Sequence, residues 1–280
     1  MTLNEKKQLK IEACKVRIGI IEATHSAKSG HPGGAMSSAE LLTYLYHREM
    51  RIDPKKPKWN ERDRFVLSKG HSSPGLYSVL ANLGFFPVED LLSFRNIDSY
   101  LQGHPNMNSV PGVDMSTGSL GQGLSVAVGM SLGLRQIKQP ARVYVLVGDG
   151  EIQEGQIWEA CMAASHYNLD NLCVIIDNNN LQIDGSVVDV MNPYPIKEKL
   201  EAFGFFVQQI DGHDFDAIED AFNKARCTKG KPSAILLKTV KGKGISFMEN
   251  IVGWHSKAPN DAEYTQALQE LTNQIAKLEA

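Results

Sequence analysis

Short runs of apolar, mostly β-branched residues alternate with longer segments of helical periodicity along most of this chain, and this alternation is the strongest constraint on its fold. The runs are residues 65–67, 143–147, 172–176, 205–210 and 234–237, and the helical segments include 124–136, 156–166 and 215–225. Buried strands alternating with helices are typical of a mainly parallel sheet with helices on both faces. We therefore predict an α/β fold. Because no repeat, low-complexity tract or flexible linker divides the chain, residues 1–280 are expected to form a single domain.

Charge and apolar patterning exclude several classes of protein. The 29 Lys and Arg residues nearly balance 32 Asp and Glu residues, whereas a nucleic-acid binder usually concentrates basic residues. No apolar run approaches the roughly 20 residues of a membrane span, and the sequence MTLNEKKQLK at the start lacks the apolar core of a signal peptide. The four cysteines form no CxxC pair, so free thiols are expected. We predict a cytoplasmic protein without a membrane or nucleic-acid partner.

Polar turns follow two of the predicted strands. The sequence GDG, with Asp149 at its centre, follows residues 143–147, and DNNN, which contains Asn179, follows residues 172–176. Their spacing is that of one strand–helix–strand unit, so both side chains can meet at the carboxyl ends of neighbouring strands, where such sheets bind ligands. Carboxylate and amide oxygens suit Mg²⁺, which completes its shell with phosphate oxygens. The pair predicts a magnesium–diphosphate site; the alternative is two ordinary turns, with Asp149 as a helix N-cap.

Histidines cluster with glycines in the predicted loops. Of the eight histidines, four directly follow a glycine, which is more than composition alone predicts: His31, His71, His104 and His213. A histidine taken alone is more often structural than catalytic. Its repeated occurrence after glycine favours a site built from loops.

The GDG and NN elements resemble the diphosphate-binding signature of thiamine diphosphate enzymes. Within that superfamily, seven motifs in the right order resemble those of the transketolases and span nearly the whole chain. The motifs are SGHPGG (29–34), FVLSKGH (65–71), QGHP (102–105), STGSLGQGLSVAVGM (116–130), GDGEIQEGQIWEA (148–160), IDNNNLQIDG (176–185) and WHSKAP (254–259). The resemblance implies a thiamine-diphosphate-binding α/β domain of the transketolase N-terminal type.

The resemblance also implies a metal and cofactor site. At the positions matching the family's motif, the metal ligands are Asp149, Asn179 and the backbone carbonyl of Leu181. The default metal is Mg²⁺, and Ca²⁺ or Mn²⁺ also accepts such an oxygen-rich set. Contacts to the diphosphate are implied for Gly150, Asn179, His71 and His255. The family's Gly-Leu element under the thiazolium ring matches Gly118, Ser119 and Leu120, although Ser119 stands where many members have Pro.

Four histidines are implied to surround the reacting sugar and to shuttle protons: His31, His71, His104 and His255. For His213, a role in this site and a structural role at a strand end remain alternatives. Glu154 is implied at the cofactor site, in an acidic network that crosses a subunit interface, and the alternative for Glu154 and Glu159 is a pair of helix-start carboxylates. Residues 238–244, KTVKGKG, are expected to form a mobile lid in which Lys243 contacts an anion.

The implied reaction transfers a two-carbon ketol unit from a ketose phosphate, by default xylulose 5-phosphate, to an aldose phosphate, by default ribose 5-phosphate. A full-length transketolase is more than twice as long as this chain and carries an activating glutamate on a second domain. The start of this sequence looks native, and residues 261–280 read as a closing helix. We therefore predict an N-terminal subunit of a split transketolase, active only with a C-terminal subunit that contains the pyrimidine-binding and C-terminal domains, in an α2β2 assembly.

Two alternatives remain. A 2-oxo acid dehydrogenase α-subunit or a deoxyxylulose-phosphate synthase fragment would share GDG and NN, but the histidine-containing motifs together with STGSLGQG favour sugar transfer. A non-catalytic cofactor-binding half is the other alternative, and the intact site residues speak against it. The sugars stay open, and a ketose carrying a different anionic group is a further possible donor.

Overall fold

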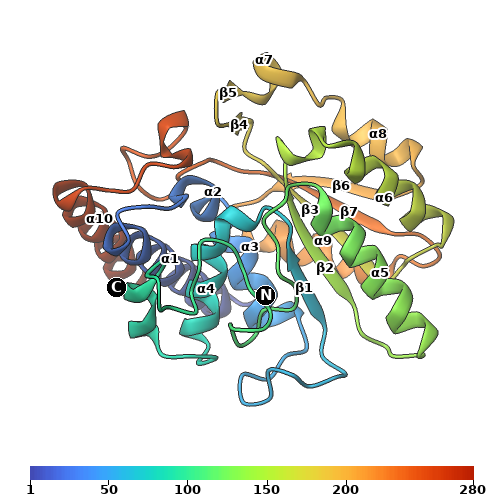
Figure 1. Ribbon diagram of the computed structural model, residues 1–280, viewed down its shortest axis with the longest axis horizontal. Helices are drawn as coiled ribbons and strands as arrows, with labels where there is room; N and C mark the ends of the chain where they lie inside the picture. Colours follow the sequence, from blue (N-terminus) through green and yellow to red (C-terminus); the bar gives the residue numbers. More distant parts are fainter.

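The computed structural model describes residues 1–280 and contains a five-stranded parallel sheet at its centre (Figure 1). The strands, in the spatial order β1-β2-β3-β7-β6, are β1 Arg64–Leu67, β2 Val143–Gly148, β3 Leu172–Asn178, β7 Ser233–Lys238 and β6 Phe206–Asp211. All five predicted strands are therefore present. The register places Gly148 opposite Asp177, so the GDG and DNNN turns leave neighbouring strands at the same edge of the sheet, as the sequence spacing predicts.

Helices connect the strands, and the three helical segments predicted between them are confirmed. The α-helices are α1 Leu3–Ser26, α2 Pro32–Met36, α3 Ala39–Tyr44, α4 Ser73–Asn82, α5 Gln122–Gln136, α6 Gly155–His166, α7 Val187–Met191, α8 Ile196–Ala202, α9 Phe215–Cys227 and α10 Asp261–Glu279. Figure 1 shows α1, α4 and α10 together on one side of the sheet, and α5 with α6 on another. A short antiparallel pair, β4 Leu181–Gln182 with β5 Gly185–Ser186, projects with α7 from the top of the molecule.

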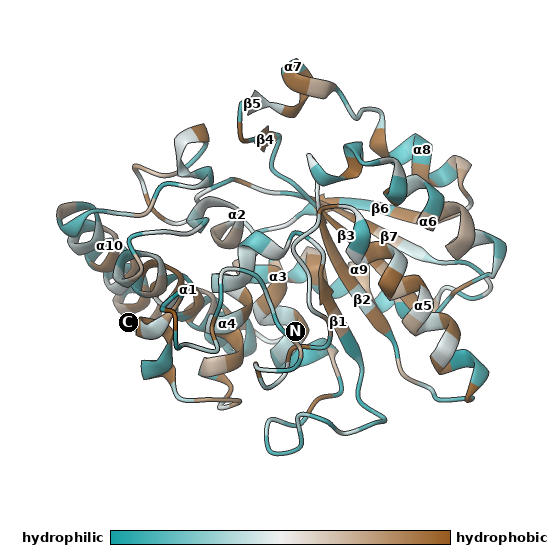
Figure 2. Cartoon of the chain, in the orientation of Figure 1, coloured by the Kyte–Doolittle hydropathy of each residue, from teal (hydrophilic) through white to brown (hydrophobic).

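Each strand of the central part of the sheet buries both of its faces. In β2, Tyr144 and Leu146 belong to a core that also contains α1, α3, α4 and α9, whereas Val143, Val145 and Val147 belong to a second core with α5, α6 and α8. The two cores lie on opposite faces because successive side chains of a strand point to opposite sides. Figure 2 shows the resulting hydrophobic colour along the central strands. The prediction of helices on both faces is confirmed.

Local signals start several helices. The side chains of Thr2 and Asn260 each accept a hydrogen bond from the amide three residues later, and the carboxylates of Glu5 and Glu263 accept one from the amides of Thr2 and Asn260. These reciprocal bonds make two capping boxes at the starts of α1 and α10. The α10 helix packs along α1 and contributes Leu271 to the larger core. No helix of this fold is long and apolar enough to cross a membrane. The four cysteines are free thiols, as predicted.

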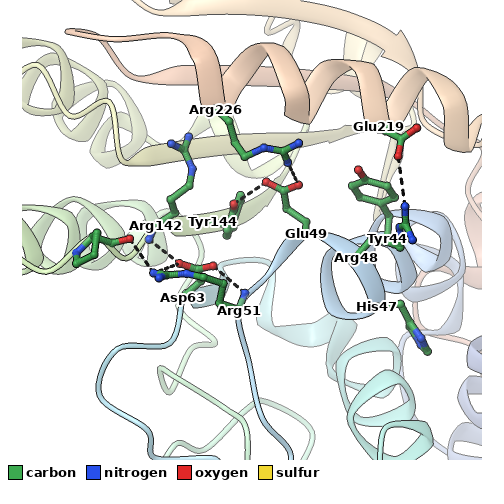
Figure 3. A pocket seen from close by; sticks show the side chains of 11 residues that line it. Tyr44, His47, Arg48, Glu49, Arg51, Asp63, Arg142, Tyr144, Glu219 and Arg226 are labelled. Atoms are coloured by element: carbon green, nitrogen blue, oxygen red, sulfur yellow. Dashed lines mark hydrogen bonds and ion pairs between the residues drawn. The ribbon is translucent and has the colours of Figure 1, made fainter. Parts of the chain in front are cut away.

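The amino ends of the strands face a cavity of about 460 Å³ that is lined mostly by charged residues (Figure 3). Glu49 accepts a hydrogen bond from Tyr144 at 2.8 Å and pairs with Arg226. Asp63 pairs with Arg51 at 3.2 Å. These carboxylates are matched by groups of the chain itself, and the GDG and DNNN turns lie at the opposite edge of the sheet. The residues singled out in the sequence therefore gather at the carboxyl ends of the strands.

Candidate active site

A cavity of about 510 Å³ lies at the carboxyl ends of β1, β2 and β3. Residues from the loops after these strands line it, together with residues from β4, the segment before α5 and the segment before α10. Most of the residues singled out in the sequence lie in its wall: His31, His71, His104, Gly118, Leu120, Asp149, Gly150, Glu154, Asn179, Leu181 and His255. Ser119 is exposed and is absent from the lining. The fold therefore brings together side chains that are separated by more than 200 positions in the sequence.

Asp149 presents a buried carboxylate to this cavity. One oxygen accepts a hydrogen bond from the Gly150 amide at 2.9 Å and the other accepts one from the Asn180 amide. No side-chain cation forms an ion pair with the carboxylate. Burial, and then the nearby carboxylate of Asp177, raise the pKa of Asp149 to about 7. A carboxylate in this position fits a bound cation, which would favour its ionised form.

The other oxygens around Asp149 come from the DNNN turn. The Asn179 Oδ1 atom accepts a hydrogen bond from the Leu181 amide at 3.1 Å, and its Nδ2 atom donates to Asp177 at 2.9 Å. The Asn179 side chain is thereby oriented with its oxygen on the side of Leu181. The chain contains no cluster of three His, Cys, Asp or Glu side chains suited to a metal. A set of one carboxylate, one amide oxygen and one carbonyl fits Mg²⁺, which binds few protein oxygens and keeps positions for phosphate and water.

A buried ion pair lies beneath these turns. Lys69, at the end of β1, donates to Asp177, at the end of β3, at 2.6 Å, and both side chains are almost completely buried. Lys69 also donates to the Gly34 carbonyl and to Ser38 Oγ, each at 2.7 Å. Although burial opposes it, Lys69 and the hydrogen bonds around Asp177 hold the pKa of that carboxyl below its usual range. Since every group of the pair is satisfied, the network fixes α2 and α3 relative to the strand ends.

Lys241, and not Lys243, enters the cavity. Its Nζ atom donates to the Leu181 carbonyl at 3.0 Å and to His255 Nδ1 at 2.8 Å, and burial lowers the pKa of Lys241 to about 8. Lys243 instead pairs with Glu249 at 3.2 Å and lies outside the cavity lining. Two lysines separated by one residue thus point in different directions in this turn, and an anion contact of Lys243 stays a prediction. The sequence pattern KTVKGKG contains no signal that distinguishes them.

The KTVKGKG segment is tied into the fold. The Gly242 amide donates to the Gly33 carbonyl at 3.0 Å, and the Asn250 amide donates to the Lys241 carbonyl at 2.9 Å. Ile245 and Met248, which follow the segment, are fully buried. These contacts argue against the predicted mobile lid.

Three imidazoles form a cluster at the cavity. The ring centroids of His31, His71 and His255 lie 5.1 to 5.4 Å apart. Burial, and then Lys241, lower the pKa of His255 to about 3, and burial, and then Arg95, lower that of His31 to about 4. Burial and then Lys69 hold the pKa of His71 well below its usual range. All three rings are therefore neutral at physiological pH, and each offers one donor and one acceptor nitrogen.

The glycines before these histidines allow close contacts between loops. A Cβ at Gly70, before His71, would lie 2.8 Å from Thr117 Oγ1, and a Cβ at Gly212, before His213, would lie 2.5 Å from the Thr239 methyl carbon. Real side chains do not tolerate such distances, so only glycine fits. The frequent glycine–histidine pairs thus reflect loops that pack tightly against one another.

His213 has a structural role. Its Nδ1 atom lies 2.9 Å from Glu40 Oε2, and its Nε2 atom accepts a hydrogen bond from the Val240 amide at 2.9 Å. The ring therefore joins the end of β6 to α3 and to the segment after β7. It is absent from the cavity lining, so the geometry favours the strand-end alternative.

Sequence reasoning missed Glu151, which follows GDG. Its buried carboxylate accepts hydrogen bonds from Ser68 Oγ, from the Gly121 amide at 3.0 Å and from the Gly148 amide at 3.0 Å. One side chain thus joins three loops of the site. Its position directly after the second glycine of the GDG motif was the available signal.

The helix after GDG begins one residue before the predicted start at residue 156. A 3₁₀ turn occupies Glu151–Gln153, and α6 starts at Gly155, so Asp149 is not a helix N-cap. Glu154 occupies the N-cap position but caps no amide with its side chain, and it lines the cavity. Glu159 is exposed on α6. The role of both glutamates in an interface network stays a prediction.

Several buried polar atoms around the cavity have no hydrogen-bond partner within the chain. They include His31 Nδ1, Thr117 Oγ1 and Gln182 Nε2. A buried polar atom without a partner is costly and is uncommon in native folds. These atoms fit a polar ligand that binds among the same loops.

In this parallel sheet, neighbouring strand ends present a carboxylate, an amide oxygen and a carbonyl beside buried imidazoles. This arrangement is typical of enzymes that bind a diphosphate cofactor through a divalent cation. The family described as transketolase, thiamine diphosphate binding domain, matches residues 8–277. The chain belongs to this family.

Individual relatives agree with the family match. The chain is 46% identical over 247 residues to a 6-deoxy-6-sulfo-D-fructose transketolase subunit of Clostridium sp. strain MSTE9, and the match covers 88% of this chain and 90% of that protein. It is 42% identical over 271 residues to an apulose-4-phosphate transketolase subunit of Phocaeicola vulgatus, covering 97% and 96%. The transketolase structure from Campylobacter jejuni superposes with a TM-score of 0.85 at 32% identity, covering 100% of this chain and 48% of that one. The chain thus spans about half the length of that transketolase.

Proposed function

We propose that this chain is the diphosphate-binding subunit of a transketolase that transfers a two-carbon ketol unit between sugars. The observation that carries the proposal is the single cavity in which the Asp149, Asn179 and Leu181 oxygens lie beside four histidines. A cation–diphosphate site alone would suit many enzymes of the superfamily. The neutral imidazoles next to it supply the hydrogen bonds that a polyhydroxylated substrate requires.

The residues of the cavity divide into two groups with different tasks. Asp149, Asn179 and the Leu181 carbonyl would hold Mg²⁺, and the diphosphate would extend along Gly150, which has no side chain to obstruct it. When bound, thiamine diphosphate supplies the nucleophilic carbon that cleaves the bond next to the ketose carbonyl. Lys241, which donates to Leu181 and His255 in this structure, brings a positive charge to the same wall.

The histidines would orient the sugar and move its protons. Lys241 donates to His255 Nδ1, so the proton of the neutral ring resides on Nε2, which is free to donate to a ligand. The Nδ1 atom of His31 is buried without a partner and can bond a sugar hydroxyl. The His104 ring packs against Gly118: a Cβ placed on Gly118 would lie 3.2 Å from His104 Cγ and 3.3 Å from its Cδ2. His104 thus lies where the histidines meet the Gly118–Leu120 turn. Neutral imidazoles of this kind can accept one proton while donating another.

A second polypeptide completes the proposed enzyme. The chain covers nearly all of two relatives named as subunits but only 48% of the C. jejuni transketolase. The partner would contribute the activating glutamate and the groups that read the distal end of the sugar, in an α2β2 assembly. The outer face of α5 supports a docking role, because Gly129 and Gly133 are exposed and a Cβ at either would meet nothing within 4 Å.

Reconstitution tests the proposal. The tagged chain is purified from its host in Mg²⁺ and thiamine diphosphate, its native mass is measured, and the co-purifying polypeptide is expressed separately. We expect a four-chain species, ketol transfer only when both polypeptides are mixed, and no transfer by either alone. An Asp149→Asn chain in the same mixture is the matched inactive control. Substantial transfer by the single chain, or no transfer by the complex with any ketose, would contradict the proposal.

The donor sugar needs its own experiment. Relatives are named for a sulfonated deoxyfructose and for apulose 4-phosphate. We propose xylulose 5-phosphate with ribose 5-phosphate as the default pair, with a ketose bearing another anionic group as the alternative. Comparing kcat/KM for xylulose 5-phosphate, apulose 4-phosphate and the sulfonated deoxyfructose on the reconstituted enzyme distinguishes these donors. A preference of at least tenfold identifies the true class of substrate.

A further inference from the structure

Arg95 lies between two of the glycine–histidine loops. Its Nη1 atom donates a hydrogen bond to Ser29 Oγ at 2.9 Å, in the loop that leads to His31. On the other side, a Cβ at Gly103 would lie 2.8 Å from the Nε and Nη2 atoms of Arg95, so the guanidinium packs directly on that glycine backbone. The Arg95 amide also donates to the Leu101 carbonyl at 2.8 Å. One residue therefore contacts two loops that are about seventy positions apart in the sequence.

The backbone at Arg95 supports a special role. Its φ of +62° is in the left-handed region, which residues with a Cβ rarely adopt. Such conformations persist where surrounding contacts determine them, and they gather at functional sites. The preceding Phe94 is fully buried and would contact a Cβ at Gly30, before His31, at 3.2 Å. Adjacent side chains thus support the loops of His31 and of His104.

The charge of Arg95 also acts on both imidazoles. Burial is the main cause that lowers the pKa of His31 and of His104, and the positive charge of Arg95 is the next in each case. The other titratable groups that face His31 are His71, His104, Lys241 and His255. The Nε atom of Arg95 is buried without a hydrogen-bond partner.

We propose that Arg95 is a positioning residue that holds the His31 and His104 loops together and places its positive charge beside both imidazoles. Arg95 is absent from the cavity lining, so it acts through the two loops rather than on the substrate. Its effect on the sugar rests on the proposed function. Its contacts with the loops belong to the chain alone, which allows an independent test.

The test follows histidine protonation by NMR in the chain without a partner. Signals of His31 and His104 are assigned with single His→Gln variants, and their titration is compared between the wild type and Arg95→Gln. We expect both midpoints to rise by about half a pH unit or more, since a nearby positive charge has been removed. Arg95→Lys keeps the positive charge, so both of its midpoints should lie close to those of the wild type. Arg51→Gln removes a guanidinium at the opposite edge of the sheet (Figure 3) and should change neither midpoint.

Ser29→Ala separates the hydrogen bond from the charge, because it removes the acceptor of Arg95 Nη1 and leaves the guanidinium. Unchanged His31 and His104 midpoints in a folded Arg95→Gln chain would overturn the proposal. If Arg95→Gln does not fold, Arg95→Met, which keeps the aliphatic stem and removes the charge, takes its place: raised midpoints support the proposal, and unchanged midpoints overturn it.

Ketol transfer by the reconstituted enzyme adds a second readout. We expect Arg95→Gln to lower kcat/KM for the donor at least tenfold and to move the acidic limb of the pH profile upward, with partial rescue by Arg95→Lys. Shifted histidine midpoints combined with an inactive wild-type complex would support the role of Arg95 in the loops while overturning the proposed function. The two failures are therefore distinguishable.

Discussion

At the scale of single residues, the site depends on buried polar side chains that connect loops. Glu151 is the clearest example, because its two carboxylate oxygens serve different partners. Oε1 accepts from Ser68 and Gly121, and Oε2 accepts from Gly148. The carboxylate therefore determines how the GDG turn lies relative to the turn before α5.

We expect Glu151→Ala to lower the free energy of unfolding by at least about 2 kcal/mol, because two backbone amides lose their acceptor. Glu151→Gln keeps the Oε1 bonds but places an NH₂ group opposite the Gly148 amide, so it should be intermediate in stability. Urea unfolding of the isolated chain measures both. Glu159→Gln, an exposed change on α6, is the control and should stay within about 0.5 kcal/mol of the wild type. Equal stability of all four proteins would contradict the argument.

The lowered pKa of the Glu40 carboxyl makes the stability of the fold depend on pH. Although burial opposes it, Arg17 and His213 lower the pKa of Glu40 from 4.5 to about 2. A depressed carboxyl pKa contributes stability that is present above about pH 4.5 and is lost as the pH falls toward 2. The contribution is on the order of 3 kcal/mol.

Glu40→Gln should therefore be less stable than the wild type at neutral pH, and the difference should shrink as the pH falls through this range. Urea unfolding at a series of pH values measures the difference. Glu89→Gln, at an exposed position without an ion pair, is the control and should leave the slope unchanged. A constant difference between Glu40→Gln and the wild type at every pH would show that the ionised form of Glu40 contributes nothing specific.

At the scale of elements, α5 carries glycines where a helix of a free-standing domain would not need them. Gly129 and Gly133 face outward, and a Cβ at either position is unobstructed. Glycine destabilises a helix interior relative to alanine by roughly 0.5–1 kcal/mol. Its presence here fits a helix that another chain approaches closely.

We expect Gly129→Ala to raise the stability of the isolated chain by up to about 1 kcal/mol, and Gly129→Leu to leave the fold intact while weakening assembly with the partner. Urea unfolding measures the first effect and sedimentation of the mixed subunits the second. Lys224→Leu, on the exposed side of α9, is a control for added apolar surface. Undisturbed assembly of Gly129→Leu would place the interface elsewhere.

At the scale of the whole molecule, the cofactor site joins the carboxyl ends of three strands to segments near both termini. A ligand that binds only the folded chain stabilises it by mass action. At about a hundredfold excess over its dissociation constant, thiamine diphosphate with Mg²⁺ should add about 3 kcal/mol and raise the melting temperature by several degrees.

Asp149→Asn should abolish most of that stabilisation, because it removes the charge of the carboxylate that we propose as a metal ligand. Thermal unfolding with Mg²⁺ alone, thiamine diphosphate alone and both together separates the contributions. Cys227→Ser, an exposed change on α9, should behave as the wild type. A full shift in Asp149→Asn would exclude this carboxylate from the metal site.

Local pattern determined much of this fold in advance. The five strands, three of the connecting helices and the pairing of GDG with DNNN follow from apolar periodicity and strand-to-strand spacing, because both depend on residues close in sequence. Asp149, Asn179 and the histidines could be selected because their motifs are contiguous. The entry of Lys241 into the cavity could not be predicted from KTVKGKG, since the direction of a side chain in an irregular turn depends on contacts with distant segments.

The sequence by itself therefore determined the class of fold, the edge of the sheet at which the two polar turns meet and many of the residues that line the cavity there. Only the tertiary structure decided how the loops are held: Glu151 across three turns, Lys69 with Asp177 beneath them, and Arg95 between two histidine loops. The physical reason is that a buried charge is stable only where several partners converge on it. Those partners come from positions far apart in the chain, so no short sequence pattern reveals them.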